Sequence, residues 1–386
     1  MPTLPPKIAV QLASLAYDIK DPINGRYTLN SPDVERNFSF DLSNGPIKGV
    51  SGSIFSRLLN RKTGFAIVGT GKEQFKDDHV ISIRGTDGLE DAITDGHFGL
   101  TVADNNALIH AGFNKTFQSI KPALESTLTP LLSKSSSGIV HCVGHSLGGA
   151  LAHLTADWVK HRYKNKVFLY SFGAPRVGLD SFSIKSTNSI DKIFRCTHAS
   201  DPVPMVPLWP YVHAPYQGSE ILLASGDGIR PEAHKMSTSA NPGYLNTANS
   251  SSWRNLQQKS SLNLSTVRLD YQNRYQASFS GYWADRISAG LITLLKDAGY
   301  YAAVMGQATI GTGLTFYDLL ARALESIAKA SVKFGEQTKG LLGHMLVFAG
   351  QIVTEITELS YKFIKWVLDK TIGALYKSAR QAMDNL

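Results

Sequence analysis

The amino-acid sequence predicts an α/β fold with a mostly parallel central sheet, followed by an all-helical C-terminal region. Two observations support this prediction. Short apolar segments typical of strands alternate with helical segments through the first 250 residues, which favours parallel strands covered by helices on both faces. Beyond Ala284 prolines are absent and the apolar periodicity becomes helical. We therefore expect an α/β domain (1–250), a loop-rich link (251–283) and a helical region (284–386).

Each element is expected from its local pattern. The first helix places Ile8, Leu12 and Leu15 on one face. Segments that are short, apolar and rich in β-branched residues predict strands. The expected strands are Phe65–Gly69, His79–Ile83, Gly138–Val143, Lys166–Phe172, Lys192–Thr197 and Ile221–Leu223. The expected helices are Lys7–Lys20, Lys115–Leu132 with an interruption near Pro122, Leu147 to about Lys160, Ala284–Gln307, Leu314–Lys333 and Lys339–Asn385.

Composition limits the class of protein. The formal net charge is +8, which draws a protein to anionic surfaces such as phospholipid headgroups, but no dense Lys/Arg stripe predicts nucleic acid as a partner. The two cysteines, Cys142 and Cys196, lie in expected strands and are predicted to be buried thiols. No secretory signal and no membrane-spanning apolar run are visible. We expect synthesis in the cytoplasm, with any export independent of a cleaved signal and action at membranes.

The most specific motif is Gly144–Gly148, a G-x-S-x-G sequence that directly follows an expected strand and precedes an expected helix. This order is typical of a nucleophile elbow, in which small residues flank a sharp turn that presents Ser146 above the edge of the sheet. The nearby helix N-terminus stabilises developing negative charge. We therefore predict that Ser146 is a catalytic nucleophile.

A nucleophilic serine needs a carboxylate and a histidine that come later in the chain. Asp201 follows an expected strand and precedes Pro202–Pro204, a rigid turn that would hold the carboxylate, so it is the preferred acid. Asp180 and Asp191 are the alternatives.

Three histidines follow Asp201 in the chain. His234 lies in a polar loop after the last expected strand and is the preferred base. His213 lies in a loop rich in proline and aromatic residues and is the alternative, whereas His344 lies in an apolar helical stretch and is expected to pack there.

Two donors are expected to form an oxyanion hole. The backbone N–H of Leu147 follows the nucleophile, and Thr86 follows the expected strand His79–Ile83. A structural role for Thr86 as a turn residue or helix cap is the alternative.

These segments together resemble the class 3 lipase family over about residues 10–250. Besides the elbow, the matching segments are Arg84–Thr86, Ile109–Phe113, Phe172–Gly178, Asp201–Pro204 and Gln217–Glu220. The resemblance implies an α/β-hydrolase fold, a triad of Ser146, Asp201 and His234, and an oxyanion hole of Thr86 and Leu147. Two departures stand out: the chain cannot build the disulfides of secreted relatives, and the expected lid segment Leu89–Phe98 lacks the tryptophan often found there.

The expected function is that of a lipolytic serine esterase acting on lipid at a membrane surface, with no metal and no cofactor. We expect hydrolysis of glycerophospholipids of the phospholipase A1 type; triacylglycerol lipase or carboxylesterase activity is the alternative. The last expected helix is amphipathic through Ile352, Ile356, Leu359, Phe363 and Val367. The helical region is therefore expected to be a packed subdomain, a shallow lipid-binding element, or the binding site of a chaperone or inhibitory protein. A membrane-perturbing protein with the hydrolase half as scaffold is the remaining alternative.

Overall fold

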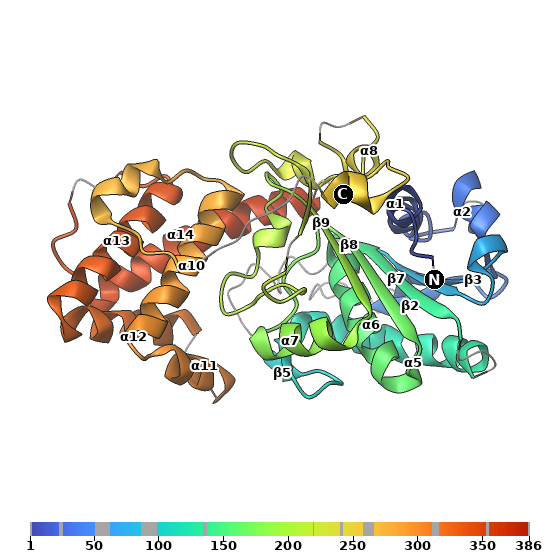
Figure 1. Cartoon of the computed structure of the whole chain (residues 1–386), viewed down its shortest axis with the longest axis horizontal. Helices are drawn as coiled ribbons and strands as arrows, with labels where there is room; N and C mark the ends of the chain where they lie inside the picture. The colour runs from blue at the N-terminus through green and yellow to red at the C-terminus, as the bar shows by residue number, and fades with distance from the viewer. Residues whose placement is uncertain are drawn as a thin grey trace.

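The computed structural model describes residues 2–22, 26–50, 62–85, 99–133, 137–218, 220–239, 242–257, 266–310, 316–352 and 355–384. Within these residues, eight strands form one sheet in the order β1-β3-β4-β7-β8-β9-β10, with β2 beside β3 (Figure 1). Their bounds are β1 Phe38–Phe40, β2 Ile47–Val50, β3 Lys62–Gly71, β4 His79–Ile83, β7 Ile139–His145, β8 Lys166–Phe172, β9 Lys192–His198 and β10 Ile221–Ala224. A separate antiparallel pair comprises β5 Leu100–Val102 and β6 Leu108–His110.

The core of the sheet consists of β4, β7, β8, β9 and β10, which pair in parallel. Their carboxyl ends therefore lie at the same edge of the sheet. All seven residues of β7 are buried, as expected for a strand covered on both faces. The antiparallel strands β1, β2 and β3 extend the sheet on the β4 side. The predicted α/β-hydrolase fold is thus confirmed.

Helices cover both faces of the sheet. On one face α1 (Pro6–Leu15) packs against β4, β7 and β8, together with α8 (Tyr244–Thr247) and α9 (Trp253–Gln257). On the other face lie α5 (Ala111–Leu132), α6 (Leu147–Tyr163) and α7 (Asp180–Ser189). The remaining short helical elements are α2 Pro32–Asn37, η1 Glu73–Phe75, η3 Val203–Met205, η4 Pro231–His234 and η5 Tyr271–Gln276.

Two boundaries differ from the sequence-based expectation. Helix α5 continues through Pro122 without the predicted interruption. Pro122 and Gln118 are both exposed, so the carbonyl that loses its hydrogen bond faces water, while Ile120 and Leu124 are buried and hold the helix on the sheet. The α/β half also extends beyond residue 250, because the Trp253 ring stacks on Phe194 of β9 with ring centroids 4.3 Å apart.

The C-terminal half is a bundle of helices. Its members are α10 Gly281–Asp297, α11 Tyr301–Ile310, α12 Phe316–Ala330, α13 Val332–Phe348 and α14 Tyr361–Asp384. The predictions of one continuous helix over Ala284–Gln307 and of another over Lys339–Asn385 are both wrong. The first segment is divided into α10 and α11, with Gly299 between them at φ +77°. Helix α13 ends at Phe348, and Gly350 follows with φ +69°, a left-handed conformation that commonly terminates helices. Asn385 lies outside the described residues.

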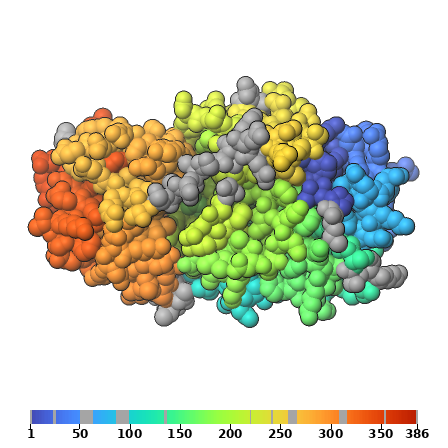
Figure 2. Space-filling view, in the orientation of Figure 1, coloured from blue at the N-terminus to red at the C-terminus, as the bar shows by residue number. Residues whose placement is uncertain are grey.

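The apolar face predicted for the last helix is largely used within the protein. Ile356 and Val367 are buried, and so are Ile364 and Leu368, whereas Ile352 precedes α14 and is 97% exposed. One apolar core cluster runs from α5 and α6 through the loop after β9 into the bundle. The two halves are therefore joined by a shared core, and Figure 2 shows their surfaces meeting along a common border.

Cys142 on β7 and Cys196 on β9 are buried free thiols, as predicted. Among the helices of the described part of the chain, none has the length and apolar character required to cross a membrane.

Candidate active site

Ser146 occupies a strained turn between β7 and α6. Its backbone has φ 57° and ψ −134°, a conformation that a residue with a side chain rarely adopts. The backbone N–H of Ser146 donates to the carbonyl of Phe172 at 2.9 Å, which fixes the turn against the end of β8. The strain is thus held by the neighbouring strand, and it points the Ser146 hydroxyl away from the sheet.

The two glycines of the motif allow this turn to close. A Cβ atom on Gly144 would lie 2.1 Å from the carbonyl oxygen of Gly148. A Cβ on Gly148 would lie 2.2 Å from the carbonyl oxygen of Ile83, at the end of β4. Both distances are far below any possible contact, so no side chain fits at either position.

A continuous chain of hydrogen bonds joins the three predicted catalytic residues. The hydroxyl of Ser146 lies 2.8 Å from Nε2 of His234. Nδ1 of the same ring lies 2.8 Å from Oδ2 of Asp201. Because a carboxylate only accepts, Nδ1 carries the proton and Nε2 is free to accept from the serine. All three residues are 0% exposed, so this arrangement is shielded from water.

The carboxylate of Asp201 is held by two further donors. Its Oδ1 accepts the backbone N–H of Val203 at 2.9 Å, and its Oδ2 accepts the hydroxyl of Tyr244 at 2.7 Å. Burial, followed by the negative charge of Asp201, raises the pKa of Tyr244 well above its ordinary value, so the phenol remains a donor. Tyr244 was not predicted from the sequence, where an aromatic residue after Gly243 in a polar stretch was the available signal.

Two other histidines hold the loop that carries His234. Nε2 of His145 lies 2.8 Å from the carbonyl oxygen of His234, and Nδ1 of His198 lies 2.6 Å from that of Ala233. Burial, followed by the positive charge that His234 would carry, lowers the pKa of His145 well below its ordinary value. A neutral His145 donates from Nε2, which leaves its Nδ1 to accept the hydroxyl of Tyr17 at 2.7 Å.

The predicted oxyanion hole is described in part. Leu147 is the first residue of α6, where backbone N–H groups have no partner within the helix, so its N–H is available to an oxyanion. Thr86 lies outside the described residues, and so does the predicted lid segment Leu89–Phe98. The preceding residue, Gly85, is described, and a Cβ placed on it would lie 3.2 Å from Cβ of Ser146. The segment before Thr86 therefore reaches the nucleophile.

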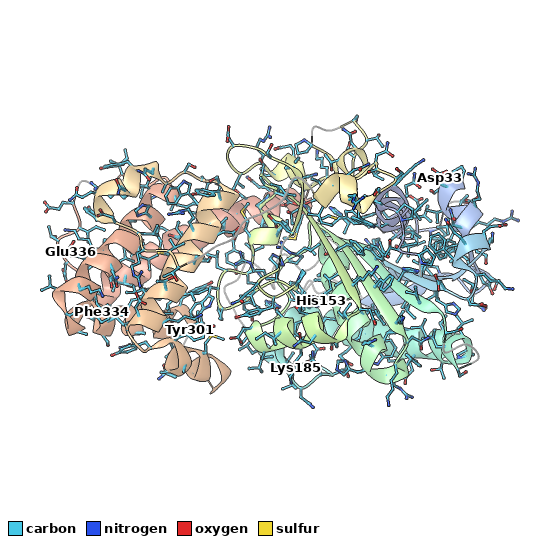
Figure 3. All side chains as sticks on the ribbon, in the orientation of Figure 1. Asp33, His153, Lys185, Tyr301, Phe334 and Glu336 are labelled. Carbon is cyan, nitrogen blue, oxygen red and sulfur yellow. The ribbon has the colours of Figure 1, made fainter. Side chains whose placement is uncertain are left out.

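The alternative acids lie apart from this constellation. Asp191 accepts from Lys160 at 2.6 Å at the surface. Asp180 begins α7 and accepts the hydroxyl of Tyr301 at 3.2 Å, a contact between the two halves; Figure 3 shows Tyr301 on the side of the bundle that faces α7.

The alternative bases make backbone contacts instead. Nε2 of His213 lies 2.7 Å from the carbonyl oxygen of Pro204. Nδ1 of His344 lies 2.8 Å from that of Gly340, and its ring stacks on Trp283, as expected for a packed residue.

This geometry suits nucleophilic acyl transfer. The hydrogen-bonded imidazole is placed to remove the serine proton, the carboxylate stabilises the resulting imidazolium, and the helix N-terminus faces the nucleophile. The hydrogen bonds of Tyr244, His145 and His198 restrict the movement of the acid and the base before any substrate binds.

Comparisons with known proteins identify similar lipases. Residues 80–211 match the model of the family described as lipase (class 3). The chain is 29% identical to the secreted mono- and diacylglycerol lipase 1 of Fusarium solani over 46% of this chain and 50% of that protein. It is 36% identical to lipase ZK262.3 of Caenorhabditis elegans over 26% of this chain and 28% of that protein. Thus the chain spans half or less of the length of these curated relatives.

Solved lipase structures were also found among the similar proteins. The triacylglyceride lipase of Rhizomucor miehei is 21% identical, with 56% of this chain and 79% of that chain covered and a TM-score of 0.41.

Proposed function

Because the chain belongs to the class 3 lipase family, we propose that it is a lipolytic serine esterase that hydrolyses acyl esters of glycerolipids. The observation that carries this proposal is the unbroken hydrogen-bond chain from Asp201 through His234 to Ser146. A buried chain of this kind turns a weakly nucleophilic hydroxyl into an acyl acceptor at neutral pH.

The reaction proceeds through an acyl-enzyme. The Ser146 oxygen attacks the ester carbonyl carbon while its proton passes to Nε2 of His234. The N–H of Leu147, with Thr86 as the second proposed donor, stabilises the oxyanion. The imidazolium then protonates the leaving alcohol as the ester bond breaks. Water repeats the sequence on the acyl-enzyme and releases a fatty acid, which restores the serine.

The finer proposal is cleavage at the first acyl position of glycerophospholipids. The formal net charge of +8 supports it, because a basic protein accumulates at anionic lipid surfaces. Neutral acylglycerols are the second candidate, and the names of the fungal relatives support them.

One pair of assays separates the two substrate classes. The protein is given a phosphatidylcholine with two different acyl chains and, separately, triolein and diolein. Release of the first-position chain from phosphatidylcholine supports the phospholipase proposal, and release from neutral lipids alone overturns it.

The esterase proposal itself is tested with an active-site fluorophosphonate. Because the reagent modifies activated serines, we expect one adduct, mapped by mass spectrometry to the peptide that contains Ser146. An adduct on another peptide, or no adduct in folded protein, contradicts the proposal.

A further inference from the structure

The helical bundle docks on the two loops that hold the catalytic acid and base. Helix α14 packs against η4, which ends at His234, and against η3, which begins two residues after Asp201. Helix α10 also packs against η3. In Figure 1 the last turns of α14, in red, extend from the bundle toward the α/β half.

Helix α14 packs against both halves of the molecule. Its first turns bury Ile364, Val367 and Leu368 within the bundle. Its last turns are also buried, with Ala379 and Ala382 both 0% exposed although the described chain ends at residue 384. Since α14 contacts η3 and η4, we assign the burial of these last turns to the catalytic loops. Small alanine side chains permit a close approach there.

The beginning of α10 closes against the acid loop. A Cβ atom on Gly281 would lie 2.7 Å from the carbonyl oxygen of Ala199 and 2.7 Å from Cε of Met205. Ala199 precedes Asp201 by two residues, and Met205 ends η3. Because the Ala199 oxygen belongs to the backbone, it cannot move aside as a flexible side chain does. Glycine is therefore the residue that lets α10 touch the segment carrying the catalytic acid.

An ion pair between Arg176 and Asp285 also joins the acid loop to α10. The backbone N–H of Arg176 donates to Val206 at 2.9 Å, and its guanidinium lies 3.4 Å from the carbonyl oxygen of Pro207 and 3.3 Å from the Asp285 carboxylate on α10. The Arg176 side chain is 8% exposed, so this contact is largely shielded from water. The guanidinium thus links the acid loop to the bundle.

We propose that the helical bundle is a positioning domain for catalysis, in which the Gly281 contact and the last turns of α14 keep the acid and base loops at the distances that activate Ser146. This inference rests on the proposed esterase function. Its physical basis is the steep dependence of catalysis on placement, since a displacement of about 1 Å costs on the order of 100-fold in rate. In the described part of the chain, the hydrogen-bond partners of Ser146, Asp201 and His234 come from the α/β half, so the bundle acts on them through the loops.

The full-length protein with Gly281→Ala tests this inference. The added methyl group must push α10 away from the acid loop, so we expect the rate of Ser146 labelling by a fluorophosphonate and kcat for a soluble ester to fall at least about fivefold. We expect KM to remain unchanged, because Gly281 contacts the acid loop and acts on the rate through that loop. Gly373→Ala on α14 is the matched control: a Cβ there meets nothing within 4 Å, and its rates should equal those of the wild type.

A second variant tests the same proposal if Gly281→Ala does not fold. Ala382→Leu enlarges the side chain at the end of α14, and we expect the same fall in kcat at constant KM in protein whose circular dichroism and thermal midpoint show it to be folded. Equal labelling of wild type and both variants overturns the positioning proposal, as does a fall that only tracks the unfolded fraction. Absence of labelling in the wild type instead overturns the esterase proposal.

Discussion

The α/β half and the helical half contribute to the site in different ways. In the α/β half, Ser146 and Asp201 come from short local motifs at strand ends, and His234 comes from the loop that follows β10. In the helical half no motif carries chemistry, yet α10 and α14 cover the loops on which that chemistry depends. The comparison shows that the reactive groups are specified by neighbouring residues, whereas the positions of those groups also depend on contacts with distant parts of the chain.

Replacement of the nucleophile is the strongest test of this comparison. Ser146→Ala removes the acyl acceptor, so we expect ester hydrolysis to fall by at least about 10⁴-fold with little change in the thermal midpoint. The rate is measured with a soluble ester, and Ser126→Ala on the exposed face of α5 is the control. Hydrolysis that survives Ser146→Ala would show that the reactive group lies elsewhere.

Substitution of the proposed acid, Asp201, is expected to have the next largest effect on kcat. Asp201→Asn loses the carboxylate that fixes the His234 tautomer, and we expect kcat to fall by about 10³- to 10⁴-fold. Asp191→Asn, which alters a surface pair with Lys160 and keeps a side-chain oxygen that can accept the backbone N–H of Val167, should retain wild-type kcat. The reverse result would assign the acid to the alternative residue.

Tyr244→Phe measures the outer hydrogen bond to the acid. The substitution removes the donor 2.7 Å from Asp201 but retains the buried ring, so we expect kcat to fall by about tenfold, as for the loss of one hydrogen bond to a charged group. Tyr170→Phe is the control, because the Tyr170 hydroxyl bonds to the backbone N–H of Leu4 and to His141, and not to a member of the triad. It should lower stability without lowering kcat. Equal kcat in all three proteins would reduce Tyr244 to a packing residue.

The smallest effect concerns the pH dependence of the junction between the halves. Burial raises the pKa of Asp285 from 3.8 to about 6, against the opposing effect of Arg176. The folded protein therefore holds this proton more tightly than the unfolded chain, and the contribution of Asp285 to stability falls as the pH rises from about 4 to about 6. We expect the thermal midpoint of the wild type minus that of Asp285→Asn to decrease over this window. Asp297→Asn, also on α10 but in a surface pair, is the control, and a constant difference for Asp285→Asn would contradict the assignment.

The sequence predicted much of the site because its signals are local. Gly144 and Gly148 flank Ser146 within five residues, and a turn that tolerates no side chain at those positions specifies its own geometry. Asp201 and His234 were chosen by their order after the nucleophile and by the strands before them. The structure brings both to hydrogen-bond distance, while the competing Asp180, Asp191, His213 and His344 make other contacts.

The residues that were missed depend on contacts between distant segments. Tyr17 lies 128 residues from the histidine it contacts, and Tyr244 lies 43 residues from Asp201. An aromatic residue after Gly243 marks Tyr244 as unusual in its polar stretch, but the neighbouring residues of neither tyrosine identify the distant residue that it contacts. The helix predicted across residues 349–360 failed for a different reason: an apolar periodicity was present, but Gly350 ends α13 and residues 355–359 pack without helical structure.

The sequence by itself predicted the fold class and the nucleophilic turn and favoured Asp201 and His234 over their alternatives, because strand periodicity, glycine placement and residue order can be read from short stretches. Only the tertiary structure decided what surrounds them: the tyrosine and histidines that restrain the catalytic loops, and the bundle that packs on those loops. These depend on burial and on the meeting of surfaces, which no single stretch of chain encodes.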